Sequence, residues 1–253
     1  RSPQQIIGGL IKTWFAELNH LDPARIFSVA ITSCTAAKQE SQRVELSRKG
    51  VNDIDAVLTT RELARLIRLN GIDMEHLEPE TSDAPFHAQS SAGRMFAVAG
   101  GETEVFARTA FKKFNRKEMP VLRLNKFRGA RDMKETQIQT SGGVIHLVAV
   151  NGLKNALRLL DEVKAGKKKV DFIEVMACPE GCINGGGQPI PAGESILKNR
   201  MRTIYDIDNK ETIKVAHRSG AAQRLYDEYL SADPGKGRSE LLHTRYSEKE
   251  ALL

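Results

Sequence analysis

The pattern of apolar and polar positions along the chain predicts helices alternating with short strands. Ser2 and Pro3 form a typical helix cap followed by a first-turn proline, and residues 4–21 continue with helical apolar spacing. The apolar runs at 25–31 and 55–59 have the length and composition of buried strands. The first third of the chain therefore predicts a helix followed by two strands.

The middle of the chain is less regular. A Thr59-x-x-Glu62 capping box predicts a helix that ends near Asn70-Gly71. Residues 78–101 are small and polar and predict a loop, whereas 102–114 have helical periodicity. The basic, irregular segment that follows contains one predicted strand, at 121–124.

The clearest unit lies further along the chain. Residues 143–150 predict a buried strand, 152–166 an amphipathic helix, and 170–176 a second strand. This spacing is typical of a right-handed parallel crossover. Helices are predicted over 193–208 and 209–231, so the chain as a whole has the pattern of an α/β protein.

Composition limits the functional classes. The chain has 253 residues, of which 40% are hydrophobic and 28% charged, and no apolar run approaches the length of a membrane-spanning helix. The net charge of +6 comes from scattered Lys and Arg without regularly spaced aromatic residues, which argues against a nucleic-acid surface. Solvated faces, or docking of an acidic electron-carrier protein, explain it better. The start at Arg1 predicts a fragment, or a subunit derived from a longer protein.

Three cysteines carry the candidate chemistry: Cys34, Cys178 and Cys182. An odd count without a secretory signal argues against a disulfide framework and predicts a reduced, cytoplasmic setting. In such a setting, two cysteines four residues apart indicate metal or redox chemistry. Cys34 follows the predicted strand at 25–31, and α/β sheets bind ligands at the carboxyl ends of their strands.

The stretch "VMACPEGCINGGGQP" at 175–189 combines the cysteine pair with Gly185, Gly186 and Gly187. A zinc site would need further paired cysteines or histidines, and none of the six histidines lies near in sequence. Thiolates beside exposed backbone amides suit an iron–sulfur cluster. The alternatives are two buried structural cysteines and a flexible glycine turn. A cubane takes four thiolates, so three cysteines leave one ligand unaccounted for.

The same stretch, "EVMACPEGCINGGGQP", resembles the third signature of the catalytic domain of FeFe-hydrogenases (iron-only hydrogenases). Other segments are similar to this family in the same order: "RSPQQIIGGLIKTWFAE", "IFSVAITSCTAAKQE", "DAVLTTRELARLIRLNGI", "SSAGRMFAVAGGETEVFARTA" and "SELLHTRY". The resemblance covers essentially the whole chain, 1–253. It implies a two-lobed α/β catalytic domain with small, mostly parallel sheets flanked by helices and a cluster between the lobes.

The resemblance also implies a cofactor and its ligands. The H-cluster of this family is a 4Fe–4S cubane joined through a cysteine sulfur to a two-iron subcluster with CO, CN⁻ and dithiolate ligands. Cys34, Cys178 and Cys182 match three cubane ligands, and Cys182 matches the bridging thiolate. The other matched positions are Glu40 in a proton-relay path, Ser2, Phe96 and Met176 near the two-iron subcluster, and Gly186 and Gln188 in the third signature. Glu40 also reads as an ordinary solvated glutamate, Phe96 as a core aromatic residue and Ser2 as a helix cap.

The activity implied is 2H⁺ + 2e⁻ ⇌ H₂ in anaerobic metabolism, with electrons from ferredoxin or a partner subunit. The sequence departs from the family pattern at three places. The first signature, with the fourth cubane cysteine, is absent. Thr32-Ser33 replace Met-Pro, and Ala37 stands where the family has a lysine that contacts a cyanide. Ala97 follows Phe96 in place of a glycine. These changes leave open a hydrogenase, a hydrogen-sensing relative and a non-catalytic iron–sulfur assembly relative.

Overall fold

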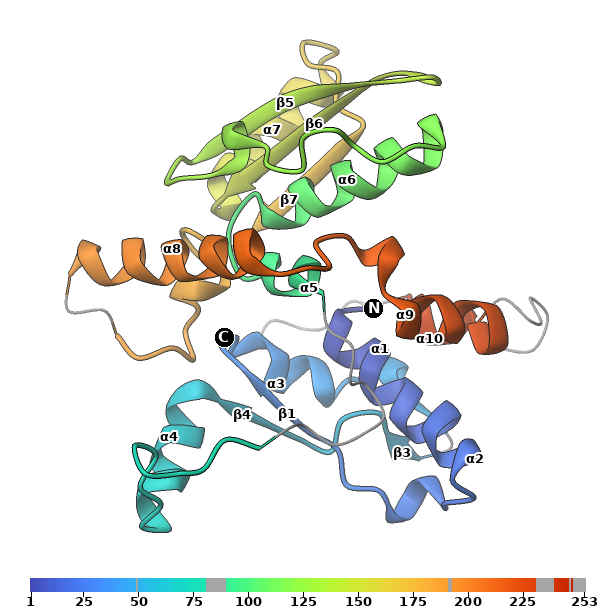
Figure 1. The fold of residues 1–253 in the computed structure, drawn as a ribbon, viewed down its shortest axis with the longest axis vertical. Coiled ribbons are helices and arrows are strands. Elements are labelled where there is room, and N and C mark those ends of the chain that lie inside the picture. The colour runs from blue at the N-terminus through green and yellow to red at the C-terminus, as the bar shows by residue number, and fades with distance from the viewer. Residues whose placement is uncertain (49, 81–89, 191–192, 231–238, 246, 248–253) are drawn as a thin grey trace. The chain divides into compact units, whose positions relative to one another are not determined.

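The computed structural model describes residues 1–48, 50–80, 90–190, 193–230, 239–245 and 247. The chain forms two compact units. The first unit contains residues 1–85 and 224–253, and the second contains residues 86–223. Among the described residues, the first unit contains two small sheets and the second contains one, and each unit has its own core (Figure 1).

The first unit begins with the helical run predicted from the sequence. It comprises α1 (Pro3–Leu10), a π-helical turn η1 (Ile11–Phe15) and α2 (Ala16–Leu18). The Ser2 side chain accepts a hydrogen bond from the backbone N–H of Gln5 at 3.4 Å, which confirms Ser2 as the N-cap.

Two parallel strands follow, β1 (Val29–Thr32) and β4 (Ala56–Thr59), paired in register from Val29↔Ala56 to Thr32↔Thr59. The strand predicted at 25–31 therefore starts later than the apolar run. A 3₁₀ turn, η2 (Pro23–Arg25), begins at a proline whose fixed φ suits a turn, and it occupies the start of that run.

Each of these strands leads into a helix, α3 (Ala36–Ser41) after β1 and α4 (Thr60–Leu69) after β4. The predicted capping box of α4 is confirmed. The Thr59 N–H donates to Glu62 Oε2 at 2.8 Å, and the Glu62 N–H donates to Thr59 Oγ1 at 3.3 Å. Both helices are thus fixed at the carboxyl edge of the small sheet.

The last part of the chain completes the first unit. The remaining elements of this unit are η3 (Val44–Leu46), the hairpin β2 (Ser47–Arg48) with β3 (Val51–Asn52), the π-helical turn η7 (Tyr226–Leu230) and α10 (Ser239–Leu242). Leu10, Tyr229 and Leu241 form one buried cluster. The backbone C=O of Leu242 accepts a hydrogen bond from the α-amino group of Arg1 at 3.0 Å. Segments more than 200 residues apart therefore share one core.

The second unit is built on a three-stranded sheet, β5 (Met133–Thr140), β6 (Gly143–Asn151) and β7 (Phe172–Met176). β5 pairs antiparallel with β6, and β7 pairs parallel with β6. The connection from β6 to β7 runs through α7 (Leu153–Lys164), so the predicted parallel crossover is confirmed.

Two helices cover opposite faces of this sheet, as Figure 1 shows. Leu147 and Ala149 of β6 pack in one cluster with residues of α6 (Gly101–Asn115). Val148 and Val150 pack in another cluster with residues of α7. Because side chains alternate along a strand, β6 contributes to both cores and reads as a continuous apolar run.

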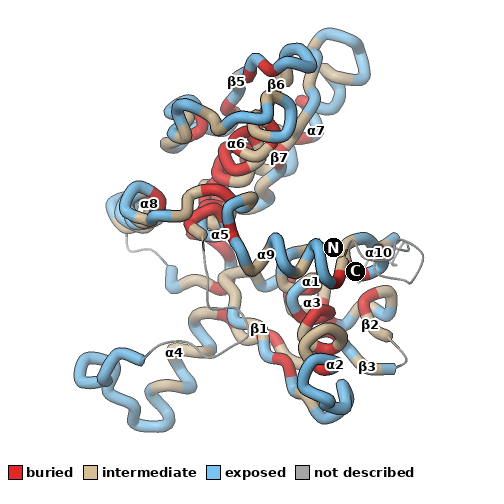
Figure 2. Tube along the Cα trace, turned by 45° about the vertical axis from the view of Figure 1, so that its right-hand side comes forward, coloured by how far each residue is buried: buried red, intermediate tan, exposed pale blue. Residues whose placement is uncertain are grey.

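The second unit also contains α5 (Ser91–Met95), η4 (Asn125–Phe127), η5 (Cys182–Asn184), α8 (Glu194–Lys210) and η6 (Ala216–Arg218), and α9 (Gly220–Leu225) begins near its end. A further core cluster joins α5, α6 and α8 through Met95, Val105 and Met201. Buried residues are concentrated along α5 and α6 (Figure 2).

Two sequence predictions of secondary structure are wrong, and one strand was missed. Residues 121–124 form no strand, because the Leu122 carbonyl accepts a hydrogen bond from Arg108 Nε at 2.9 Å instead of pairing in a sheet. The strand lies at 133–140, where the buried positions include Lys134 and Thr140 and so hide the apolar alternation. Residues 211–215 are not helical, because α8 ends at Lys210 before an extended Glu211.

The α/β class is confirmed, although the sheets are more evenly mixed than predicted. Among the described residues, two strand pairings are parallel and two are antiparallel. The loop predicted at 78–101 contains α5, and its residues 81–89 lie outside the described ranges. No helix in the described ranges combines the length and apolar character that a membrane crossing requires.

Candidate functional site

The cysteine loop, residues 177–188, leaves the carboxyl end of β7. Met176, the last residue of β7, pairs with Asn151 at the end of β6. Its carbonyl accepts a hydrogen bond from the Gly152 N–H at 2.7 Å. The loop therefore starts at a fixed point on the edge where ligands bind in α/β sheets.

Short backbone turns shape the cysteine loop. The Cys178 carbonyl accepts from the Gly181 N–H at 3.1 Å, and the Cys182 carbonyl accepts from the Gly185 N–H at 3.0 Å. A third turn follows, in which the Gln188 N–H donates to the Gly185 carbonyl at 2.9 Å. Both cysteines are half-buried, and no disulfide joins any of the chain's three cysteines, all of which are described.

A second loop, the glycine-rich loop of residues 96–101, is bound to the cysteine loop by backbone hydrogen bonds. The Ala99 N–H donates to the Glu180 carbonyl at 3.2 Å, and the Ile183 N–H donates to the Ala97 carbonyl at 3.0 Å. Gly181 lies between these contacts with φ +89°, and a Cβ there would come within 2.7 Å of the Ala99 nitrogen. The close approach of the two loops thus requires a glycine at this position.

The glycine-rich loop is in turn anchored to the sheet. The Glu174 carboxylate on β7 is only 2% exposed and accepts from the backbone N–H groups of Gly100 and Thr103, each at 2.7 Å. It thereby satisfies donors at the start of α6, where the helix dipole favours negative charge. Lys134 Nζ on β5 donates to the Ala99 carbonyl at 2.7 Å, and burial lowers the pKa of this lysine.

α8 holds the far side of the cysteine loop. Arg200 Nη1 donates to the Ile183 carbonyl at 3.0 Å, and Nη2 donates to the Pro189 carbonyl at 2.9 Å. Met201, the next residue, packs in the same buried cluster as Ile183. The backbone on both sides of the glycine run is therefore bound by one guanidinium.

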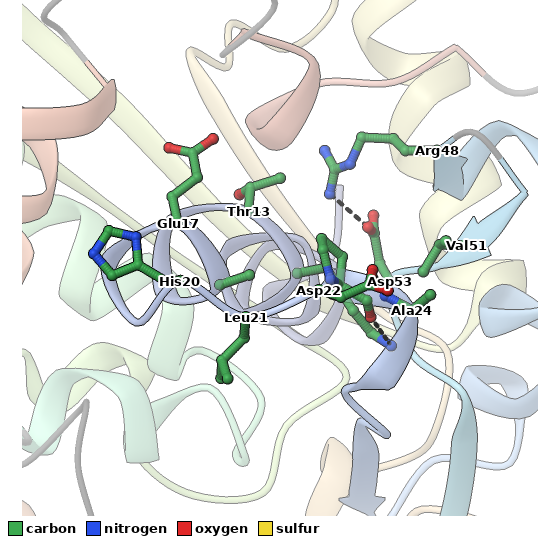
Figure 3. A pocket seen from close by; sticks show the side chains of 12 residues that line it. Thr13, Glu17, His20, Leu21, Asp22, Ala24, Arg48, Val51 and Asp53 are labelled. Atoms are coloured by element: carbon green, nitrogen blue, oxygen red, sulfur yellow. Dashed lines mark hydrogen bonds and ion pairs between the residues drawn. The ribbon is translucent and has the colours of Figure 1, made fainter.

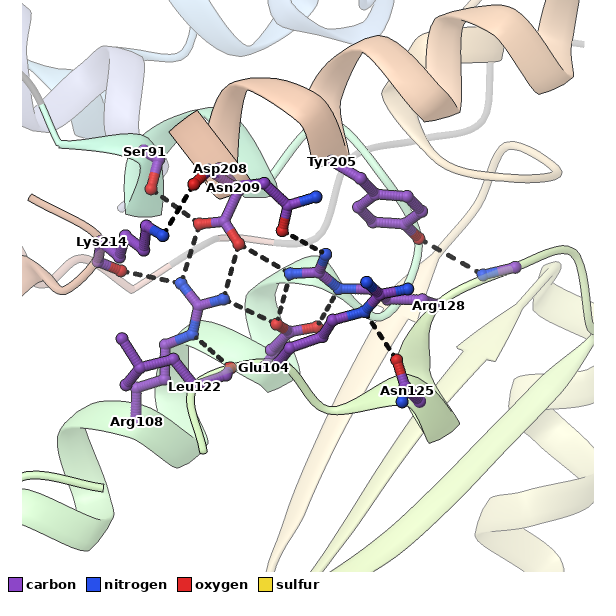
Figure 4. A network of polar contacts seen from close by, with 12 residues as sticks. Ser91, Glu104, Arg108, Leu122, Asn125, Arg128, Tyr205, Asp208, Asn209 and Lys214 are labelled. Carbon is purple, nitrogen blue, oxygen red and sulfur yellow. Dashed lines mark hydrogen bonds and ion pairs between the residues drawn. The ribbon is translucent and has the colours of Figure 1, made fainter. Parts of the chain in front are cut away.

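α8 itself is fixed by a buried charge network, drawn in Figure 4. Asp208 accepts from Arg108 at 2.8 and 3.0 Å and from Arg128 at 2.6 Å, and Glu104 accepts from the same two arginines. The Ser91 hydroxyl donates to Asp208 at 2.7 Å. Burial opposes ionisation of Asp208, but the hydrogen bonds from Arg108 and Ser91 outweigh it and lower its pKa to about 2.

Cys34 belongs to the first unit, in the turn between β1 and α3. Its N–H donates to Thr32 Oγ1 at 3.2 Å. The side chain is half-buried and packs against a cluster that contains Ala37, Ile54 and Val57. Ala37 is only 7% exposed, so the position where the family has a lysine faces a packed interior here.

Two residues predicted separately, Ser2 and Glu40, are in contact. Ser2 Oγ donates to Glu40 Oε2 at 2.8 Å, and Gln4 Nε2 donates to the same oxygen at 2.9 Å. Lys38, the residue after Ala37, instead forms an exposed ion pair with Glu62 at 2.8 Å. Lys38 is thus directed toward the start of α4.

A cavity of about 720 Å³ lies elsewhere in the first unit, lined by α2, η2 and the β2–β3 hairpin (Figure 3). Its basic side chains are already paired, Lys12 with Asp55 at 2.8 Å and Arg48 with Asp53 at 2.5 Å. None of the predicted site residues lines this cavity. We therefore do not assign it to the predicted chemistry.

The structure brings some predicted residues together within each unit. Cys178, Cys182, Gly186 and Gln188 share the cysteine loop, with Met176 at its start, and Phe96 packs against the core cluster below the glycine-rich loop. Neither unit by itself gathers three His, Cys, Asp or Glu side chains as a metal site among the described residues. Because Cys34 lies in the other unit, the joint ligation by three thiolates stays a prediction.

Sequence reasoning missed the residues that hold these loops: Glu174, Arg200, Arg108, Arg128 and Asp208. The i, i+4 spacing of Glu104 and Arg108 was the one local signal. Asp208 and Arg200 lie far along the chain from the groups that they bind, so no local pattern could reveal them.

The donor set fits an iron–sulfur group. Two half-buried thiols sit one turn apart in a loop whose backbone is fixed from three sides. Thiolates are the usual ligands of iron–sulfur clusters, and a fixed backbone preorganises them. With two thiols, the cysteine loop would supply only part of a cubane's ligand set.

Comparisons with known proteins agree with this chemistry. Residues 1–186 match the family described as iron only hydrogenase large subunit, C-terminal domain, and residues 194–249 match the family described as iron hydrogenase small subunit. The chain is 34% identical to iron hydrogenase 1 of Clostridium pasteurianum over 97% of its own length and 44% of the relative's. It is also 30% identical to the cytosolic iron-sulfur assembly component 3 of Bos taurus, over 97% of its length and 52% of the relative's.

The fold comparison gives the same result. The apo [FeFe]-hydrogenase HydA1 from Chlamydomonas reinhardtii matches with a TM-score of 0.81 and 31% identity, over 97% of this chain and 68% of that one. The chain spans about half the length of the curated relatives above. On its sequence match, its fold and its intact cysteine loop, the chain belongs to the iron-only hydrogenase family, as a divergent relative of the C-terminal domain found in the large subunits.

Proposed function

We propose that this chain is the cluster-binding part of a hydrogenase that interconverts protons and H₂, with electrons from ferredoxin or a partner subunit. The observation that carries the proposal is the cysteine loop, in which Cys178 and Cys182 are held one turn apart by backbone bonds to the glycine-rich loop. Such a loop costs glycines and backbone strain, which a purely structural pair of cysteines does not need.

Each cysteine has a role in this proposal. Cys34, Cys178 and Cys182 would be thiolate ligands of a 4Fe–4S cubane, and Cys182 would also bridge to the two-iron subcluster. When bound, the H-cluster would supply the open iron site at which protons combine with electrons delivered by ferredoxin or a partner subunit. The fixed backbone of the cysteine loop would hold the thiolates in place.

The first unit offers a proton path in its own side chains. The Ser2 hydroxyl donates to Glu40 Oε2 at 2.8 Å, so Ser2 can pass its proton to Glu40 and accept another at its oxygen. Gln4 Nε2 bonds the same carboxylate oxygen at 2.9 Å and orients it. The distance between Ser2 Oγ and Glu40 Oε2 lies in the range that proton transfer between hydrogen-bonded groups requires.

A second function is favoured by the environment of Ala37. Its methyl group is packed beside Ile54 and Val57, and Lys38 is engaged by Glu62, so neither residue offers the ammonium group that the family places beside a cyanide. Loss of this charge-assisted hydrogen bond would weaken the retention of the two-iron subcluster. This favours a hydrogen sensor with slow turnover, or a cluster-binding relative of the assembly components. The cytoplasmic setting expected from the cysteine usage stays a prediction.

One experiment separates these functions. The full-length protein is matured with the two-iron cofactor, and infrared bands of CO and CN⁻ are recorded together with hydrogen evolution, beside a known hydrogenase as control. Bands with turnover support the hydrogenase, and bands with negligible turnover support the sensor. An iron–sulfur signal without bands supports the assembly-type protein. Cys182→Ala should abolish the bands, and bands that persist in this variant would refute the bridging role.

A further inference from the structure

One side chain, Arg200, joins the two segments of this chain that match different family models. Arg200 lies on α8, in the segment that matches the small subunit, and both of its hydrogen bonds are made to the segment around the cysteine loop. Its two acceptors, the carbonyls of Ile183 and Pro189, stand on either side of residues 184–188. The whole glycine run is thus spanned by one planar guanidinium.

We propose that Arg200 is a positioning residue, through which the small-subunit segment fixes the cysteine loop and sets the electrostatic environment of the Cys182 thiolate. The effect of Arg200 on the reduction potential of a cluster rests on the proposed function above. Its two hydrogen bonds to the backbone, called the Arg200 clamp below, do not. Ile183, which accepts one of the two bonds, directly follows Cys182 in the chain. A shift of its carbonyl therefore moves the cysteine backbone.

The chemistry of arginine suits this role. The guanidinium has its donors in a rigid fork, so Nη1 and Nη2 can bond two carbonyls at once, which an ammonium on a flexible stem does less well. Glycines have no side chains whose packing could order a loop, so hydrogen bonds to the backbone around residues 185–187 carry more of its order. The guanidinium of Arg200 donates to the carbonyls on both sides of this run.

α8 is rigid enough to act as the support. Asp208, two turns further along the same helix, is bound by Arg108 and Arg128 in the buried network. Met201 packs in the core cluster that contains Ile183. Arg200 is therefore placed by a helix that is fixed both by buried charge and by apolar packing, as a positioning residue requires.

The charge of Arg200 has a separate effect. A cation close to a cluster stabilises its more negative, reduced form and so raises the reduction potential. The fork and the charge can be separated by substitution, because Arg200→Lys keeps the charge and loses the fork, whereas Arg200→Gln loses both. Arg202→Gln, an exposed position on the same helix, is the matched control.

The first measurement is hydrogen exchange of the full-length protein without cluster. The N–H groups of Asn184, Gly185 and Gln188 are all hydrogen-bonded in the loop. Losing two charge-assisted bonds should speed their exchange about tenfold in Arg200→Gln and in Arg200→Lys, but not in Arg202→Gln. Unchanged exchange in both Arg200 variants would overturn the clamp, whether or not the protein binds iron.

The second measurement is the reduction potential and EPR spectrum of the reconstituted cluster. We expect a lower potential in Arg200→Gln, a near-normal potential in Arg200→Lys and no change in Arg202→Gln. Equal reduction potentials in the wild type and the three variants would overturn the electrostatic role of Arg200. The hydrogen bonds to the backbone would not be affected by that result. If the wild type holds no iron while the exchange result stands, the proposed function fails and the clamp survives. Should Arg200→Gln not fold, Arg200→Lys alone decides the exchange test.

Discussion

The two cysteine-bearing regions are held by different means. In the second unit, the cysteine loop is bound through its main chain by the glycine-rich loop and by Arg200. In the first unit, Cys34 sits in a turn where its N–H bonds the Thr32 side chain, beside the packed Ala37.

The difference bears on how each region tolerates substitution. A loop held by main-chain contacts needs particular glycines and a particular path, so most changes in it cost stability. The Cys34 turn is shaped by the Thr32 side chain and by packing beside Ala37, so side-chain changes there alter its surroundings directly. The two regions are therefore expected to respond differently to substitution.

The largest expected effect comes from removing the anchor of α8. Asp208→Ala leaves Arg108 and Arg128 buried with Glu104 as their carboxylate partner in the network, and should cost about 3–5 kcal/mol. The loss should appear as faster hydrogen exchange at β6 and β7, with β1 and β4 unchanged as an internal reference. The exposed Asp206→Asn on the same helix is the control, and equal exchange in both variants would contradict the anchoring role.

The next effect tests the contact between the two loops. Gly181→Ala would place a methyl group 2.7 Å from the Ala99 nitrogen at φ +89°, and strain plus overpacking should cost about 2–4 kcal/mol. The matched control is Gly166→Ala, which has φ +69° but nothing within 4 Å, and should cost about 1–2 kcal/mol from strain alone. Hydrogen exchange of the cysteine loop measures both. A similar loss of stability in Gly181→Ala and Gly166→Ala would mean that the close approach of the cysteine loop and the glycine-rich loop does not contribute to stability.

A smaller effect is expected in the first unit, where Ala37→Lys restores the residue type of the family. A lysine side chain must displace packing near Ile54 and Val57, so the cluster-free protein should lose about 1–3 kcal/mol at β1 and β4. Ala36→Lys, at an exposed neighbouring position, should be nearly neutral. A neutral Ala37→Lys would show that the site still has room for the lysine. The difference between the regions would then be one of chemistry rather than packing.

The smallest effect concerns the adjacent lysine. Lys38→Met removes an exposed ion pair with Glu62 and should change stability by less than about 1 kcal/mol. Iron content and the infrared bands of the matured protein should stay as in the wild type. Loss of the bands would contradict the view that Lys38 serves only the ion pair with Glu62 of α4, and would show that it replaces the missing lysine.

The sequence predicted the elements whose signals are local. The Ser2 cap, the Thr59–Glu62 capping box and the crossover from β6 to β7 all depend on residues close together in the chain, and all are confirmed. β5 was missed because its buried positions include Lys134, whose ammonium bonds the Ala99 carbonyl. The position of that lysine depends on the glycine-rich loop, which a local pattern cannot report.

The candidate site divides in the same way. The motif identified Cys178 and Cys182. The resemblance matched Ser2 and Glu40 to separate roles, and the hydrogen bond that joins them was not predicted. The supports at Glu174, Arg200 and Asp208 were not predicted, because each acts across the fold on a backbone group or a distant charge. Residues expected to bind a ligand directly were found through a sequence motif. The residues that support them lie in no recognisable local sequence pattern.

The discontinuous first unit has a consequence for biosynthesis. Leu10 clusters with Tyr229 and Leu241, so the core beside α1 lacks two of its members until the ribosome has made residue 241. The second unit is continuous, and all of its residues emerge earlier than those two. Within this chain, the residues that carry Cys34 precede the second unit, and the residues that complete their core follow it. A nascent chain whose residue 223 has just left the ribosome would therefore hold a complete second unit, whereas its first unit would still lack Tyr229 and Leu241.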